Sequence, residues 1–102
     1  MTEVRVIAKF AARKGMEKQL RELLRGMLAP THAEPGCELY ELYESDTKGR
    51  FYFYERWESQ AALDKHAASP HFQRLEESAR GVLQEPFEVN ILEAIQAGAA
   101  AR

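Results

Sequence analysis

The sequence predicts an α+β domain of the ferredoxin-like type, in which helices cover one face of a four-stranded antiparallel sheet. Two observations support this fold. Four short segments show a hydrophobic period of two, and the segments between them show helical spacing. The resulting order, β-α-β-β-α-α-β, is that of a split βαβ fold. At 102 residues the chain has the size of one domain, which we assign to residues 1–95, with a frayed tail at 96–102.

The first strand and the first helix follow from two different spacings. Apolar and polar or charged residues largely alternate over residues 3–11, which predicts a strand. From Gly15 the apolar positions lie on one helical face, which predicts a single amphipathic helix that ends before Pro35-Gly36. These positions are Met16, Leu20, Leu23, Leu24, Met27 and Leu28.

A β-hairpin is predicted next. The β-rich segments 37–45 and 50–58 flank the polar connector 46–49, which begins with Asp and ends with Gly. In the second strand both faces carry aromatic residues, so both faces should be covered. Because helices cover only one face, we expect a homodimer in which two copies pack through their open sheet faces.

Two short helices and a last strand complete the chain. Ser59 is the expected N-cap of a helix with Ala62, Leu63, His66 and Ala67 on its apolar side. Ser69-Pro70 should begin a second helix, since serine caps helices and proline suits the first helical position. Its apolar face would hold Phe72, Leu75, Ala79, Val82 and Leu83, and residues 87–95 should form the last strand.

Composition excludes several classes of protein. The 14 basic and 16 acidic residues give a net charge of −2, which argues against nucleic acid as a partner. No apolar run has the length of a membrane helix, and the first residues do not form a leader, so a cytoplasmic location and no membrane partner are expected. A single cysteine allows no intrachain disulfide. No glycine-rich nucleotide motif or metal-binding histidine spacing occurs, so neither a cofactor nor a metal is expected.

The candidate site combines aromatic residues with one histidine and one carboxylate. Seven of the ten aromatic residues lie between positions 40 and 57, which suits a pocket for a flat apolar ligand or simply a packed core. His66 should lie on the sheet-facing side of its helix, either as a general base or as a core histidine that bonds a backbone carbonyl. Glu55 could orient His66, bind substrate, or pair with a lysine or arginine.

Three segments together resemble the antibiotic biosynthesis monooxygenase (ABM) superfamily of dimeric α+β barrels. They are Glu34-Pro35-Gly36-Cys37, the strand Arg50–Trp57, and His66 followed by Ser69-Pro70-His71-Phe72. The resemblance covers residues 3 to about 95. It implies a ferredoxin-like homodimer with its pocket between sheet and helices.

The resemblance also implies an activity. Its members include cofactor-free enzymes that oxidise quinols and polycyclic phenols with O2, haem-degrading enzymes, and an isomerase of a phosphorylated signalling sugar. Haem degradation is disfavoured because Ala8 and Glu76 stand at the positions of that branch's asparagine and haem-ligating histidine. The isomerase, and a dimeric protein that binds a ligand without turnover, remain alternatives.

Under the monooxygenase reading, the catalytic residues would be His66 as base and Glu55 as its partner. The substrate, a small aromatic or carbonyl compound, would contact five further residues: Trp57, Phe53, His71, Phe72 and Tyr40. No metal or cofactor takes part, because the substrate itself supplies the electrons for O2.

Overall fold

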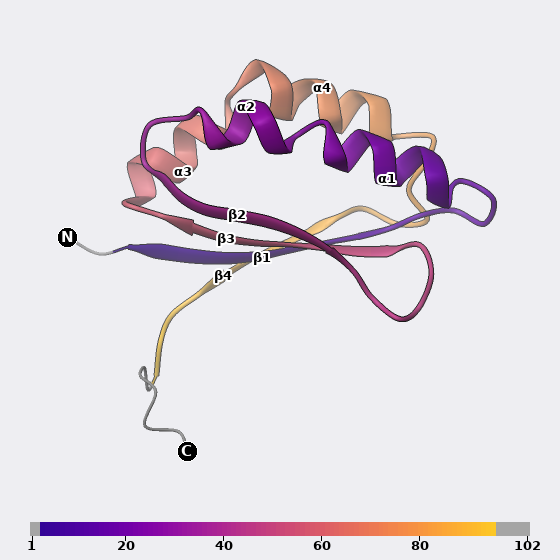
Figure 1. The fold of residues 1–102 in the computed structure, drawn as a ribbon, viewed down its shortest axis with the longest axis horizontal. Helices are drawn as coiled ribbons and strands as arrows, with labels where there is room; N and C mark the ends of the chain where they lie inside the picture. The colour runs from indigo at the N-terminus through magenta and orange to yellow at the C-terminus, as the bar shows by residue number, and fades with distance from the viewer. Residues whose placement is uncertain (1–2, 96–102) are drawn as a thin grey trace.

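The computed structural model describes residues 3–95, which form one sheet and four short helices (Figure 1). The predicted tail at 96–102 lies outside these residues. In chain order the elements are β1 (Val4–Ala11), α1 (Glu17–Arg25), α2 (Leu28–His32), β2 (Cys37–Glu44), β3 (Arg50–Trp57), α3 (Gln60–Ala67), α4 (Pro70–Ala79) and β4 (Glu88–Leu92).

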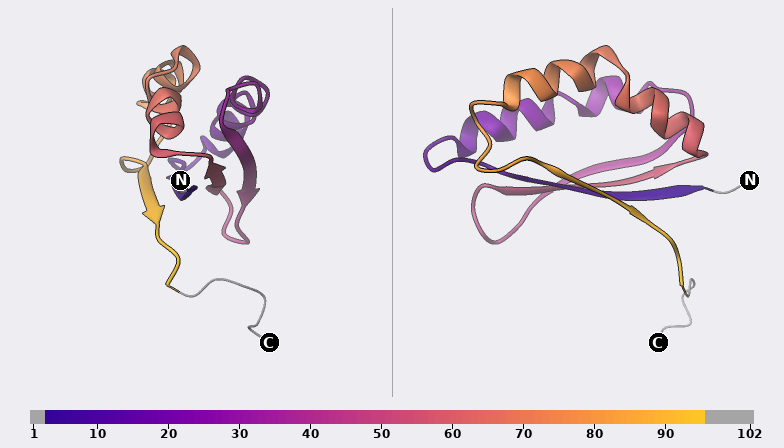
Figure 2. Two further views of the ribbon diagram at one scale, coloured as in Figure 1. Left: turned by 90° about the vertical axis from the view of Figure 1, so that its left-hand side faces the viewer. Right: turned by 180° about the vertical axis from the view of Figure 1, so that it is seen from behind.

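The sheet has the strand order β2-β3-β1-β4, and every neighbouring pair is antiparallel. All four helices lie on the same side of this sheet, as the two views of Figure 2 show. The helices form two rows, with α1 beside α4. This arrangement confirms the predicted α+β, ferredoxin-like fold.

The core lies between the helices and one face of the sheet. On β3 every second residue from Phe51 to Trp57 is buried, while the residues between them are only partly covered or exposed. Leu20 and Leu24 of α1 are fully buried against this face. The two faces of β3 therefore divide as the period of two predicted.

The prediction of one continuous helix from Gly15 to Pro35 is wrong. α1 ends at Arg25 and α2 begins at Leu28, with the turn at Gly26 and Met27 between them. Pro30 explains the break, because a proline ring clashes with the carbonyl four residues earlier, here that of Gly26. The helical spacing of apolar residues nevertheless continues across the break, because Met27 is buried like the apolar residues of α1.

The last helix and the last strand are shorter than predicted. α4 ends at Ala79, so Val82 and Leu83 belong to the following turn, where Leu83 pairs with Ala12 in an isolated bridge. β4 ends at Leu92 and does not continue to residue 95. The predicted helix starts are confirmed: the hydroxyl groups of Ser59 and Ser69 accept hydrogen bonds from the N–H groups of Ala62 and Phe72.

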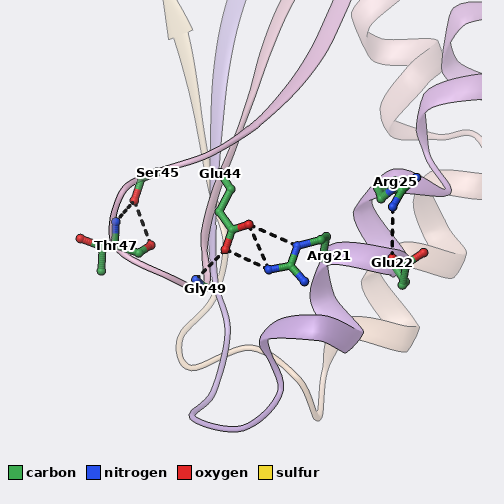
Figure 3. A network of polar contacts seen from close by, with 7 residues as sticks. All are labelled: Arg21, Glu22, Arg25, Glu44, Ser45, Thr47 and Gly49. Atoms are coloured by element: carbon green, nitrogen blue, oxygen red, sulfur yellow. Dashed lines mark hydrogen bonds and ion pairs between the residues drawn. The ribbon is translucent and has the colours of Figure 1, made fainter.

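One polar network ties the β2–β3 hairpin to the first helix (Figure 3). The Arg21 guanidinium donates hydrogen bonds to both carboxylate oxygens of Glu44, at 3.0 to 3.2 Å. Glu44 also accepts the backbone N–H of Gly49 at 3.1 Å, and this bond lowers the pKa of the carboxyl group. The hairpin is thereby fixed against α1.

The Pro-Gly turn before β2 has a steric requirement for glycine. Gly36 has φ of +87°, and a Cβ atom there would lie 2.7 Å from the Cβ of Ala62. Gly36→Ala should therefore lower the free energy of unfolding by about 2 kcal/mol, through both backbone strain and this clash. Gly15→Ala is the matched control, because Gly15 has φ of +88° but no atom within 4 Å of the added Cβ. Urea unfolding should show the smaller loss for Gly15→Ala; equal losses would contradict the steric argument.

The second face of the sheet carries no helix. The strand register places Ile7 opposite Tyr54, and Tyr52 opposite Tyr43, on this open face. Tyr43 is 54% exposed, and the side chains of Arg5 and Lys9 lie among these rings. In the described part of the chain, no helix has the length and apolar character needed to cross a membrane.

Candidate functional site

A cavity of about 210 Å³ lies between the helix-covered face of the sheet and the pair α3 and α4. Five of the predicted site residues line it: Tyr40, Phe53, Glu55, His66 and Phe72. Its outer wall is β4, where Val89 and Ile91 face the cavity side of the sheet yet remain about half exposed. The cavity therefore opens at the β4 edge, where the helices no longer cover the sheet.

Two predicted residues, Trp57 and His71, do not line this cavity. Trp57 lies behind it, fully buried, with its ring 4.7 Å from the His66 ring between centroids. His71 lies at the start of α4 and borders a shallow groove between that helix and α1. The sequence analysis expected both residues to contact the substrate. In this conformation neither of them borders the cavity.

His66 is held by a carboxylate. Its Nδ1 atom lies 2.8 Å from Oε2 of Glu34, and its Nε2 atom is buried with no hydrogen-bond partner. Because a carboxylate accepts hydrogen bonds, Nδ1 carries the proton and Nε2 keeps its lone pair. Burial lowers the pKa of His66, against the opposing effect of Glu34, so the ring is neutral at pH 7.

Glu34 was missed as a functional residue by the sequence analysis. The same oxygen, Oε2, also accepts Nε2–H of His71 at 2.6 Å, so one carboxylate joins two histidines. Glu34 lies 32 positions before His66, in the turn that the Pro-Gly pair closes. The only available signal was the Glu-Pro-Gly-Cys segment, which carried the family resemblance but no predicted role.

These three side chains could also hold a metal ion. One ligand atom from each of Glu34, His66 and His71 lies within 4.8 Å of the others. The sequence spacing argued against a metal-binding pair formed by His66 and His71, because Pro70 separates their helices. In the structure the two rings come close to each other because both bond the Glu34 carboxylate. In this conformation both ring N–H groups already bond the Glu34 carboxylate.

Glu55 is not the partner of His66 that the sequence suggested. It is 4% exposed, and its Oε1 accepts the indole N–H of Trp57 at 2.9 Å. Among the described residues it also forms no ion pair with a lysine or arginine, which was another of the three expectations; the third, substrate binding, stays a prediction. Burial raises the pKa of Glu55 to about 7, the Trp57 hydrogen bond opposes this shift, and the negative charge of Glu34 adds to it.

Aromatic rings form most of the remaining wall. Tyr40 stacks on Phe53 with centroids 4.5 Å apart, and the Phe72 ring meets His66 edge-on at 5.2 Å. Burial, followed by the charge of Glu55, raises the pKa of Tyr40, so its phenol stays protonated. The cavity is a largely apolar slot for a flat ring, with the buried polar groups His66 and Glu55 in its wall.

The buried Glu55 carboxyl should make stability depend on pH. Its folded pKa of about 7 lies above the ordinary value of 4.5, so the folded state binds this proton more tightly. The associated stability is present below pH 4.5 and is lost as the pH rises to about 7, a total of about 3 kcal/mol. Glu55→Gln lacks this titration. The difference in the free energy of unfolding between the variant and the unmodified protein should therefore shift by about 3 kcal/mol in favour of the variant from about pH 4.5 to pH 8. Urea unfolding at both pH values measures the difference; the exposed Glu77→Gln is the control, and an unchanged difference for Glu55→Gln would contradict the prediction.

Comparison with known proteins finds relatives that share this fold. Residues 3–78 match the family described as antibiotic biosynthesis monooxygenase. A Mycobacterium tuberculosis protein named "Putative monooxygenase Rv0793" is 42% identical over 89 residues, which are 87% of this chain and 88% of that protein. Its solved structure superposes with a TM-score of 0.88 at 38% identity and covers 96% of this chain and 100% of that chain.

Two further solved structures have the same fold. PA3566 from Pseudomonas aeruginosa is 31% identical, with a TM-score of 0.87 and coverage of 94% of this chain and 97% of that chain. A structure described as an antibiotic biosynthesis monooxygenase is 30% identical, with a TM-score of 0.84 and coverage of 91% of this chain and 99% of that chain. The similarity spans the whole described fold, including the elements that form the cavity.

Proposed function

Because the chain belongs to the antibiotic biosynthesis monooxygenase family, we propose that it is a cofactor-independent monooxygenase that oxidises a quinol or a related phenolic compound with O2. The observation that supports this most directly is His66. Its Nε2 lone pair is buried in the wall of an aromatic cavity and has no partner, while Glu34 holds the other ring nitrogen. A phenolic hydroxyl in the cavity would supply the missing hydrogen bond.

The first step is removal of a phenolic proton by Nε2 of His66. The resulting imidazolium lies against the Glu34 carboxylate, which stabilises its positive charge. His71 donates to the same carboxylate oxygen and so helps to keep Glu34 in place. Glu34 and His71 are in this scheme positioning residues, and His66 is the catalytic base.

The phenolate then reduces O2. One electron passes from the phenolate to O2, and the phenoxyl radical and superoxide combine in a C–O bond at a ring carbon that carries hydrogen. The resulting peroxide anion takes back the proton held by His66, and the hydroperoxide then loses water, which includes the hydrogen of that ring carbon, and leaves a quinone carbonyl. One oxygen atom thus enters the product and one leaves in water. The protein contributes deprotonation, orientation and an enclosed apolar space.

Glu55 supports this scheme in its protonated form. Below about pH 7 its carboxyl group is neutral and can donate a hydrogen bond to the phenolate oxygen that develops in the cavity. Above that pH the ionised carboxylate would repel the phenolate.

An oxygen-electrode screen tests the proposal. Purified protein with hydroquinones and naphthoquinols should consume O2 faster than the same solution without protein, and a quinone product should form. Turnover of a carbonyl substrate under strict anaerobiosis would favour the isomerase alternative. Tight binding without turnover across the panel would favour a ligand-binding protein.

We further propose that the protein is a homodimer that pairs the open faces of its two sheets. The apolar residues Ile7, Tyr52 and Tyr54 on this face support the proposal, because a twofold contact would cover the same patch on both copies. Light scattering after size exclusion should give twice the chain mass at micromolar concentration. Ile7→Glu should shift the protein to the monomer, whereas Glu77→Gln on the helical side should not; a monomeric unmodified protein would exclude this assembly.

A further inference from the structure

The cavity wall carries two carboxyl groups and, in the described part of the chain, no basic side chain that could pair with them. Two carboxylates, those of Glu55 and Asp64, line it. Among the described residues that line it, none is a lysine or an arginine, and the one histidine is held neutral. An anionic ligand would meet the Asp64 carboxylate, joined above about pH 7 by that of Glu55, and it would lose its hydration without gaining an ion pair.

A third carboxylate adds to this field from behind the wall. Glu34 lies against His66, and its charge is strong enough at Glu55 to raise the pKa of that group. Asp64 lies on the exposed side of α3, where its Oδ1 accepts a hydrogen bond from the Gln60 side chain at 2.9 Å. It forms no ion pair with a described lysine or arginine. The negative charge thus extends from the interior to the rim.

The aromatic rings of the wall favour the opposite kind of ligand. Phe10, Tyr40, Phe53 and Phe72 line the same space. Ring faces attract organic cations, and an ammonium group at the rim would also meet the Asp64 carboxylate. The rings and the carboxylates therefore both favour a cationic ligand.

We infer that this cavity selects its ligand by charge: it takes hydroxylated aromatic molecules that are neutral or carry an ammonium group, and it rejects those with a carboxylate, sulfonate or phosphate. The choice of a hydroxylated ring rests on the proposed function, whereas the charge preference rests on the lining alone. Asp64 is the residue that favours an ammonium group at the rim. The cavity volume of about 210 Å³ limits the ligand to one or two rings.

Three compounds with one hydroquinone ring test the inference: gentisyl alcohol, which is neutral, gentisate, which is anionic, and gentisylamine, which is cationic. Their affinities are measured by calorimetry without oxygen, so that binding is separated from turnover. Gentisate should bind at least about tenfold more weakly than the alcohol, and the amine about threefold more tightly. Asp64→Asn should remove the advantage of the amine.

Asp46→Asn is the matched control, since it removes the same charge from the β2–β3 turn, at the end of the sheet opposite to α3 (Figure 1). It should leave the order of the three affinities unchanged. Gentisate binding as tightly as the alcohol, an amine preference that survives Asp64→Asn, or no binding of any of the three would overturn the inference. If the charge order holds and no O2 is consumed, the proposed monooxygenase activity fails and the charge selection stands.

Discussion

His66→Ala should lower kcat for O2-dependent oxidation by at least about 100-fold, because general-base catalysis contributes about 10² to 10⁴ in rate. The alanine removes the only described histidine in the cavity wall and leaves no other side chain with a buried, unpartnered nitrogen lone pair. The KM should change much less, since the aromatic wall that binds the ring remains. The measurement is initial O2 uptake across substrate concentrations, with circular dichroism to verify folding.

Glu34→Gln tests whether the carboxylate acts through His66. The glutamine can still accept a hydrogen bond from Nδ1–H, but it cannot stabilise an imidazolium with a charge. We expect kcat to fall by about tenfold or more, which is less than in His66→Ala. The acidic limb of the pH–rate profile, which we assign to His66, should move to lower pH. If His66→Ala retains the original rate, the assigned base is wrong.

The pH profile of kcat/KM should be bell-shaped with a narrow maximum. The base must be unprotonated, so the rate is lost as the pH falls through the pKa of His66, which burial places below its ordinary 6.5. Glu55 must be protonated, so the rate is also lost as the pH rises above about 7. Glu55→Gln should abolish only the alkaline limb, whereas a profile with both limbs in that variant would contradict the role of Glu55.

Trp57→Ala should lower the free energy of unfolding by about 3 to 5 kcal/mol, the usual cost of truncating a buried aromatic residue. The indole is 0% exposed and packs on His66 and Tyr40. The truncation also leaves the buried Glu55 carboxyl without its hydrogen-bond donor. For a domain of this size the loss is a large part of the total stability.

Trp57→Phe separates packing from hydrogen bonding. It keeps most of the ring volume and removes the indole N–H, so it should cost less than the alanine variant. Because the Trp57 hydrogen bond lowers the pKa of Glu55, its loss should raise that pKa further and move the alkaline limb of the rate profile to higher pH. Chemical unfolding and the rate profile check both parts. Equal stability of the two variants would show that the indole volume contributes little.

Much of the fold could be predicted because its signals are local. The alternation on β3, the serine caps of α3 and α4, and the change of period after Gly15 each depend on a few neighbouring residues. Element ends were less predictable. The helix was predicted to include Val82 because this apolar residue continues the helical spacing. Val82 is indeed buried, but in the turn after the helix ends at Ala79, and a residue buried in a turn cannot be told from one buried in a helix by its spacing.

The site was predictable only in part. His66 and Glu55 were selected because polar groups on an apolar face are costly without a function or a partner. Their partners could not be assigned, since a residue's neighbours in space depend on which elements pack together. Glu55 bonds Trp57 on its own strand, and His66 bonds a residue in a turn from another part of the chain.

The sequence by itself determined the class of fold, the apolar face of each element and the presence of one histidine and one carboxylate on the inner side. These properties follow from the period of the chain, which is a local quantity. Only the tertiary structure decided that Glu34 joins His66 to His71, that Trp57 supports the cavity from behind, and that the wall, as far as residues 3–95 form it, carries carboxyl groups without a lysine or an arginine. These contacts connect residues far apart in the chain, and their formation depends on how the turn at Pro35-Gly36 and the two helix rows pack onto one sheet.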